Sequence, residues 1–209
     1  MIKRTLLVML LAALAGLAQT VDCLVAVVNG KVITLIDVEI AAEFGLGREA
    51  GVEAGRDPRL AALDALIERK VVLDLARESR SADRNEIAAA LAELRRRLGE
   101  DVFTAKLGKF GLAETDLEPY LEDRILFDRA LALRFSQTIP VSLTEVERHY
   151  RDSYVPEQIR LGKAAEPLER VADLIESRLR EERRMKQTAD WVRDLRNRAD
   201  IQIKKDCLK

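Results

Sequence analysis

The sequence contains few of the residues that build catalytic and metal sites. Its 209 residues include one histidine, His149, and two cysteines, Cys23 and Cys207. These three side chains are too few for a tetrahedral zinc site, which needs four protein ligands. Phosphate-binding loops and dinucleotide fingerprints are absent, and no nucleophile motif lies near His149. We therefore expect no catalytic residue, no metal and no cofactor, and a protein that is not an enzyme.

The sequence also lacks an excess of charge of either sign. Lys and Arg number 35 and Asp and Glu number 36, for a net charge of −1. This balance disfavours nucleic-acid binding through bulk positive charge, and acidic residues surround the short arginine runs, so no nucleic-acid partner is expected. Aromatic residues make up only 4% of the chain and charged residues 34%. A composition rich in Ala, Leu, Glu and Arg is typical of helices.

The first residues have the pattern of a secretory signal peptide. Lys3 and Arg4 precede an apolar stretch from Leu6 to Ala18, which ends in small residues. At about 1.5 Å per residue, this helix is short for a hydrocarbon core of about 30 Å. We predict a cleaved signal at residues 1–18, in preference to an uncleaved anchor or a lipoprotein signal. The mature protein is then expected to be periplasmic or otherwise exported, without integral membrane contact.

The mature chain is predicted to be mainly helical, with five to seven helices and a small sheet. Asn29-Gly30 between two β-branched runs predicts a tight hairpin, because a type I′ turn needs positive φ at both central residues. Apolar spacing and capping signals then predict helices over 34–44, 57–79, 83–98, 101–110, 115–135, 142–151 and 167–198, and a closing strand over 201–203. Residues 19–151 form the N-terminal part of one domain, 152–166 a linker, and 167–209 the long helix and strand that complete it.

Four segments in this order resemble the SurA-like peptide-binding chaperone domain, which is related to PrsA and trigger factor. The segments are Val25–Thr34, Leu63–Leu73, Val141–Tyr150 and Ala199–Ile203. The resemblance covers about residues 22–204 and rests on the order of the segments, since none is a catalytic motif. It implies an ATP-independent holdase that binds extended segments of unfolded, nascent or outer-membrane-bound exported proteins.

The sequence departs from the larger members of this family in one respect. They carry a parvulin prolyl isomerase domain where this chain has only residues 152–166, which contain no His or Cys. The resemblance therefore implies a chaperone module without isomerase activity in this chain. The alternatives are an assembly factor for one dedicated envelope partner and, third, a prolyl isomerase. The long terminal helix also leaves a homo-oligomer open.

Two groups of residues are candidate sites. Cys23 and Cys207 lie beside the first and last predicted strands. An antiparallel pairing of these strands would bring the thiols together for a disulfide, and a parallel pairing would separate them. The second group comprises five aromatic residues in the middle helices, which belong either to the core or to a peptide-binding surface: Phe103, Phe110, Tyr120, Phe127 and Phe135.

Overall fold

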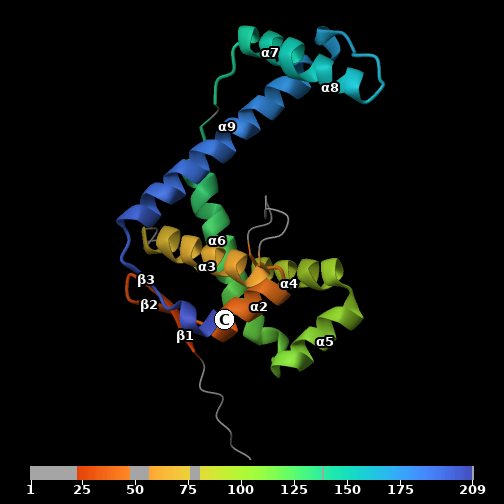
Figure 1. Cartoon of the computed structure of the whole chain (residues 1–209). Helices are drawn as coiled ribbons and strands as arrows, with labels where there is room; N and C mark the ends of the chain where they lie inside the picture. Colours follow the sequence, from red (N-terminus) through yellow and green to blue (C-terminus); the bar gives the residue numbers. More distant parts are fainter. Residues whose placement is uncertain (1–22, 48–56, 76–80, 138, 209) are drawn as a thin grey trace, which may run out of the picture.

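The computed structural model describes residues 23–47, 57–75, 81–137 and 139–208. The protein is mainly helical, with one three-stranded antiparallel sheet and a long C-terminal helix, as the sequence predicts. Figure 1 shows a lower body that holds the sheet and most helices, and an upper arm at the far end of the last helix. The predicted signal peptide at 1–18 lies outside the described residues.

The sheet joins the two ends of the described chain. Strands β1 (Leu24–Val28) and β2 (Lys31–Thr34) form a hairpin, and β3 (Ile201–Ile203) pairs antiparallel with β1 on its other side. Asn29 and Gly30 have φ values of 48° and 80°, as a type I′ turn requires. The Asn29 N–H donates to the Asp200 carbonyl, and the Asn29 side-chain oxygen accepts from the Asp200 N–H at 2.9 Å. The hairpin turn therefore holds the start of β3 in register.

Two helices of the body begin at capping boxes that the sequence contains. Thr34 and Asp37 form a capping box at α2, and Asp83 and Glu86 form one at α4. The expected cap at Thr115 is wrong, because a 3₁₀ turn over Glu114–Leu117 precedes the helix there. The body helices are α2 (Leu35–Glu43), α3 (Pro58–Leu75), α4 (Arg84–Leu98), α5 (Glu100–Phe110) and α6 (Glu118–Arg134).

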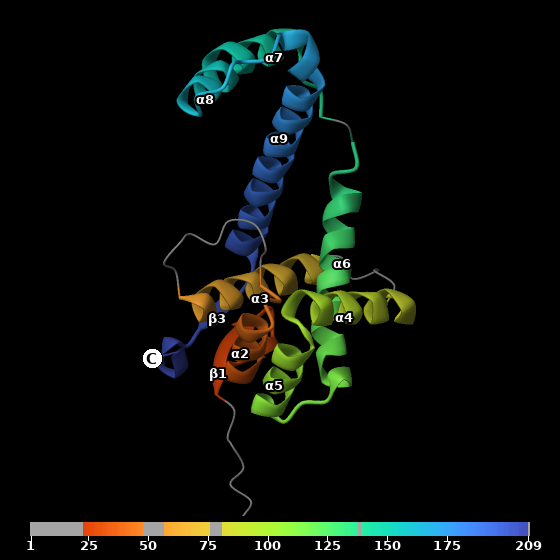
Figure 2. The same ribbon diagram turned by 90° about the vertical axis from the view of Figure 1, so that its right-hand side faces the viewer.

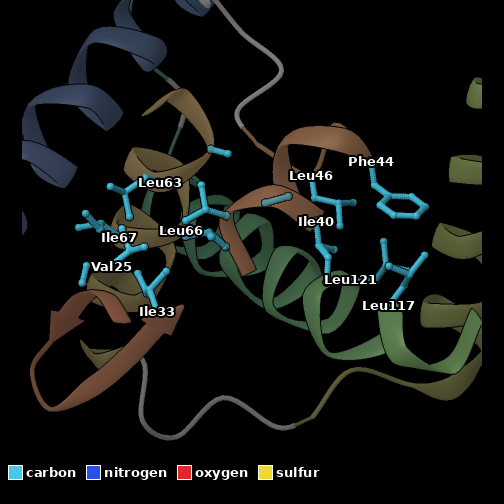
Figure 3. Packing of buried hydrophobic residues seen from close by; sticks show 14 of the residues in the cluster. Val25, Ile33, Ile40, Phe44, Leu46, Leu63, Leu66, Ile67, Leu117 and Leu121 are labelled. Carbon is cyan, nitrogen blue, oxygen red and sulfur yellow. The ribbon is translucent and has the colours of Figure 1, made fainter. Parts of the chain in front are cut away.

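The main core lies between the sheet, α2, α3 and α6. Figure 3 shows side chains from these elements pointing toward one another, and they include Val25, Ile33, Ile40, Phe44, Leu46, Leu63, Leu66, Ile67, Leu117 and Leu121. Arg69 of α3 is also buried, with 5% of its surface exposed. Its guanidinium donates to the Leu46 carbonyl, and burial lowers its pKa. Arg69 thus satisfies a backbone acceptor just beyond α2.

The arm has a small core of its own. It comprises residues 139–185: α7 (Leu143–His149), a π-helical turn (Tyr150–Tyr154), α8 (Val155–Arg160) and the first part of α9 (Leu168–Arg198). Val146, Val171 and Ile175 are buried together there. The segment predicted to be a linker, 152–166, begins with helical structure that continues as far as Arg160.

Helix α9 runs from the arm to the body as one continuous element (Figure 2). Near its C-terminal end, Trp191 meets Phe135 edge-to-face, with ring centroids 5.7 Å apart. Arg196 donates to the Asp64 carboxylate of α3 at 2.7 Å. These two contacts fix the lower part of α9 against α6 and α3. The upper part of the helix packs on α7.

Candidate functional site

The described residues hold few groups that could carry chemistry. No cluster of three or more His, Cys, Asp or Glu side chains within this part of the chain is placed to hold a metal ion. His149 is the last residue of α7 and is partly buried. The candidate sites that remain are a disulfide, a set of aromatic side chains, exposed apolar side chains and two surface hollows.

The disulfide joins Cys23 and Cys207, whose Cα atoms are 6.1 Å apart. Cys23 directly precedes β1, and Cys207 lies in a 3₁₀ turn over Lys205–Leu208 that follows β3. The antiparallel pairing of β1 with β3 brings these positions to the same end of the sheet. The bridge spans 184 residues of sequence, so it closes almost the whole described chain into one loop.

Three of the five candidate aromatic residues lie in or against the main core of the body. Phe103 is only 1% exposed, and its ring meets Phe44 edge-on with a centroid distance of 6.0 Å. Phe110 is partly buried against the same core, with its ring 6.5 Å from Phe44. Tyr120 is also partly buried, and its hydroxyl donates to the Asp37 carboxylate at 2.7 Å. Phe103 in particular is too deeply buried to contact a peptide in this conformation.

The other two candidates lie further along α6. Phe127 is partly buried, and Phe135 follows the helix and contacts Trp191. The Arg134 guanidinium lies 5.7 Å from the centre of the Phe135 ring. The structure thus places Phe135 at the junction of α6 with α9, away from the Phe44 cluster. The five aromatic residues do not form a single surface.

Large apolar side chains are exposed on the arm, where the sequence indicates no binding surface. Ile159 is 68% exposed, Leu143 66% and Leu174 65%. Leu161 and Met185 of the arm are also exposed. Outside the arm, Leu133 near the end of α6 is 72% exposed. Ile159 and Leu161 fall within the segment predicted to be a linker, which shows no apolar periodicity. That irregular pattern explains why the sequence gives no signal for them.

A hollow of about 220 Å³ lies between α4 and α6 in the body. Its apolar lining comes from both helices, and charged side chains of both signs surround it. It is lined by Ala90, Glu93, Leu94 and Arg97 of α4 and by Leu121, Arg124, Ile125 and Asp128 of α6. The apolar stripe of α4 predicts the buried face of that helix, but spacing alone does not show where two helices leave space between them.

A larger hollow of about 570 Å³ lies beside α2 and α5 and is lined mostly by charged residues. Glu43 on its wall accepts hydrogen bonds from Lys106 and Lys109 of α5. These ammonium groups lower the pKa of Glu43 to about 2, so the carboxylate stays ionised at neutral pH. The paired charges link α2 to α5.

The comparisons with known proteins give no family for this chain. No protein family model matches it, and no curated protein matches it. In the described part of the chain, no helix is both long enough and apolar enough to cross a membrane.

Proposed function

We propose that the protein is an exported, ATP-independent chaperone of the holdase type. It binds extended segments of unfolded or outer-membrane-bound proteins and has no isomerase activity of its own. The observation that carries the proposal is the exposure of several large aliphatic side chains on the arm, among them Leu143, Ile159 and Leu174. Such exposed aliphatic side chains offer apolar area that a client chain can cover on binding.

The energetics suit reversible binding. Burial of apolar surface contributes roughly 25 cal/mol per Å², so one leucine contributes about 2 kcal/mol when fully covered. Association also costs several kcal/mol in lost freedom of the two partners. Several arm side chains must therefore contact a client at once for a stable complex. Such weak and distributed contacts allow release without ATP.

The charges of the arm support broad specificity. Arg178 lies 3.3 Å from Glu182 and 3.7 Å from Glu157, and Arg180 pairs with Glu176. Since these charges are matched within the arm, they give a client segment no strong preference for one sign of charge. The resemblance of the four sequence segments to the SurA-like domain supports the same function.

The experiment follows aggregation of two unrelated, chemically unfolded clients by light scattering, one of them an outer-membrane protein. We expect the purified mature protein to suppress both near stoichiometric ratios. Leu143→Ser with Leu174→Ser removes apolar surface from the arm and should raise the ratio needed. The matched control, Leu60→Ser with Leu75→Ser, changes two exposed leucines on α3 of the body and should behave as wild type.

Three outcomes contradict this proposal. No suppression of either client at any ratio excludes a general holdase. Suppression of only one client, with a saturable one-to-one complex, favours the alternative of an assembly factor for a dedicated partner. Equal activity of the arm variant and the body variant would show that the arm side chains do not form the binding surface.

A further inference from the structure

We propose that the hollow between α4 and α6 anchors one large, uncharged apolar side chain, such as a phenylalanine, of an extended polypeptide. This inference rests on the proposed chaperone function and adds a specific subsite on the body to the exposed surface of the arm. It is carried by the size of the hollow, by its apolar base and by the pairing of the charges around it.

The base of the hollow is apolar and well fixed. Leu94 and Leu121 are 3% and 2% exposed and form part of the main core. Ala90 and Ile125 are partly buried beside them. Ala90 is small, so its position on α4 leaves space that a larger side chain would fill. A guest ring would therefore contact aliphatic carbon supplied by both helices.

The volume matches a single side chain. An engineered apolar cavity of about 150 Å³ accommodates benzene. The hollow between α4 and α6 measures about 220 Å³, enough for a phenyl ring with its methylene but small for a folded element. Sites for drug-sized ligands are generally larger, from about 300 Å³ upward. The size therefore favours one anchoring side chain over a complete small-molecule ligand.

The charged residues around the hollow already have partners within the protein. Arg97 donates to the carbonyls of Phe44 and Gly45 at 3.0 and 3.2 Å, which ties α4 to the end of α2. Glu93 accepts from Arg96 at 2.6 Å. Arg124 lies 3.9 Å from Asp128 on the next turn of α6. A rim with two acids and two bases, each engaged locally, favours a neutral guest over an ionic ligand.

The larger hollow beside α5 does not fit the same guest. Three acidic and three basic side chains contribute to its wall. Burying a phenyl ring there would remove water from these charged groups, which is costly. The apolar base of the smaller hollow avoids that cost.

The test uses a peptide with one central phenylalanine in a Gly/Ser background, labelled for fluorescence anisotropy, and the same peptide with alanine in its place. We expect the phenylalanine peptide to bind at least about ten-fold more tightly, because only it buries a ring. Ala90→Phe fills the hollow and should weaken its binding about ten-fold or more. Ala89→Phe is the matched control, since Ala89 is the exposed neighbour on the same helix.

A second measurement does not depend on the folding of any variant. Methyl resonances of Ile125 in the wild-type protein should shift when the phenylalanine peptide is added, whereas those of Ile175 in the arm core should not. If the Ile125 methyl groups stay unshifted at saturation, or if Ala90→Phe and Ala89→Phe bind equally, the hollow is not the anchor.

The subsite and the chaperone function fail in different ways. If Ile125 responds to the peptide but the protein suppresses no aggregation, the subsite stands and the holdase proposal falls. If aggregation is suppressed and Ala90→Phe has no effect on the peptide, the chaperone proposal stands and this inference is overturned.

Discussion

Replacing both cysteines tests how far the disulfide stabilises the fold. The variant Cys23→Ser with Cys207→Ser removes a bridge across 184 residues. In the chain-entropy description, the stabilisation grows with the logarithm of the loop length and reaches about 5 kcal/mol for a loop of this size. That value is an upper figure, since measured losses are typically 2–5 kcal/mol. A domain is stabilised by roughly 5–15 kcal/mol in total, so we expect a loss of about 3–5 kcal/mol to be severe.

The assay is urea unfolding of the oxidised protein and of the double variant, followed by circular dichroism. Reduced wild-type protein is the control, because it loses the bridge but keeps both sulfur atoms in place. We expect the reduced wild type and the double variant to unfold at similar, lower urea concentrations. A midpoint for the double variant that matches the oxidised wild type would refute the reasoning, because the loop closure would then contribute nothing.

Three further predictions concern single contacts and the terminal strand. Deletion of residues 199–209 removes β3 and the bridge, so the melting temperature should fall markedly; an unchanged temperature would contradict the role of the closing strand. Tyr120→Phe removes the hydrogen bond to Asp37 and should lower the free energy of unfolding in urea by about 1–2 kcal/mol. An unchanged free energy of unfolding would show that this hydrogen bond does not stabilise the fold. Glu43→Gln should destabilise the protein by less than about 1 kcal/mol. Because the pKa of Glu43 falls from 4.5 to about 2 in the folded state, the difference in the free energy of unfolding between wild type and variant is complete above about pH 5 and disappears as the pH approaches 2. A difference that grows on acidification would contradict this prediction.

The parts of the fold that could be predicted from the sequence depend on local backbone chemistry. Asn29-Gly30 forms the hairpin because both residues tolerate positive φ. A capping box begins α4 at Asp83, whose side chain accepts from the Asn85 N–H, and α7 begins at Ser142, whose N–H donates to the Glu145 carboxylate. These features need only a few neighbouring residues, and the structure confirms them.

Two stretches of the chain have a local structure that their sequence patterns do not indicate. Thr115 has the sequence pattern of a cap, but the chain forms a 3₁₀ turn there, in which Asp116 accepts from the Ala113 N–H. The segment at 152–166 lacks apolar periodicity, yet it begins with the π-helical turn and α8. A π-helical turn shifts the spacing of the side chains, so a search for a period of 3.6 residues misses it.

The candidate sites could be predicted only in part. The sequence shows that the cysteines lie beside the terminal strands, and the strand direction then decides whether they meet. It does not show which aromatic residues are buried, because an apolar stripe has the same spacing in a core and on a binding surface. The sequence gives no signal for the hollow beside Ala90 and Ile125, because that space depends on how α4 crosses α6.

The position of β1 in the middle of the sheet has a consequence for the timing of folding. Of its two neighbours in the sheet, β2 follows β1 directly in the sequence, whereas β3 lies more than 170 residues away, near Asp200. During synthesis the hairpin can therefore form early, whereas the second edge of β1 stays open until β3 has left the ribosome. Contacts of such long range form slowly. A chain with this topology cannot complete its sheet before nearly all of the described residues have been synthesised.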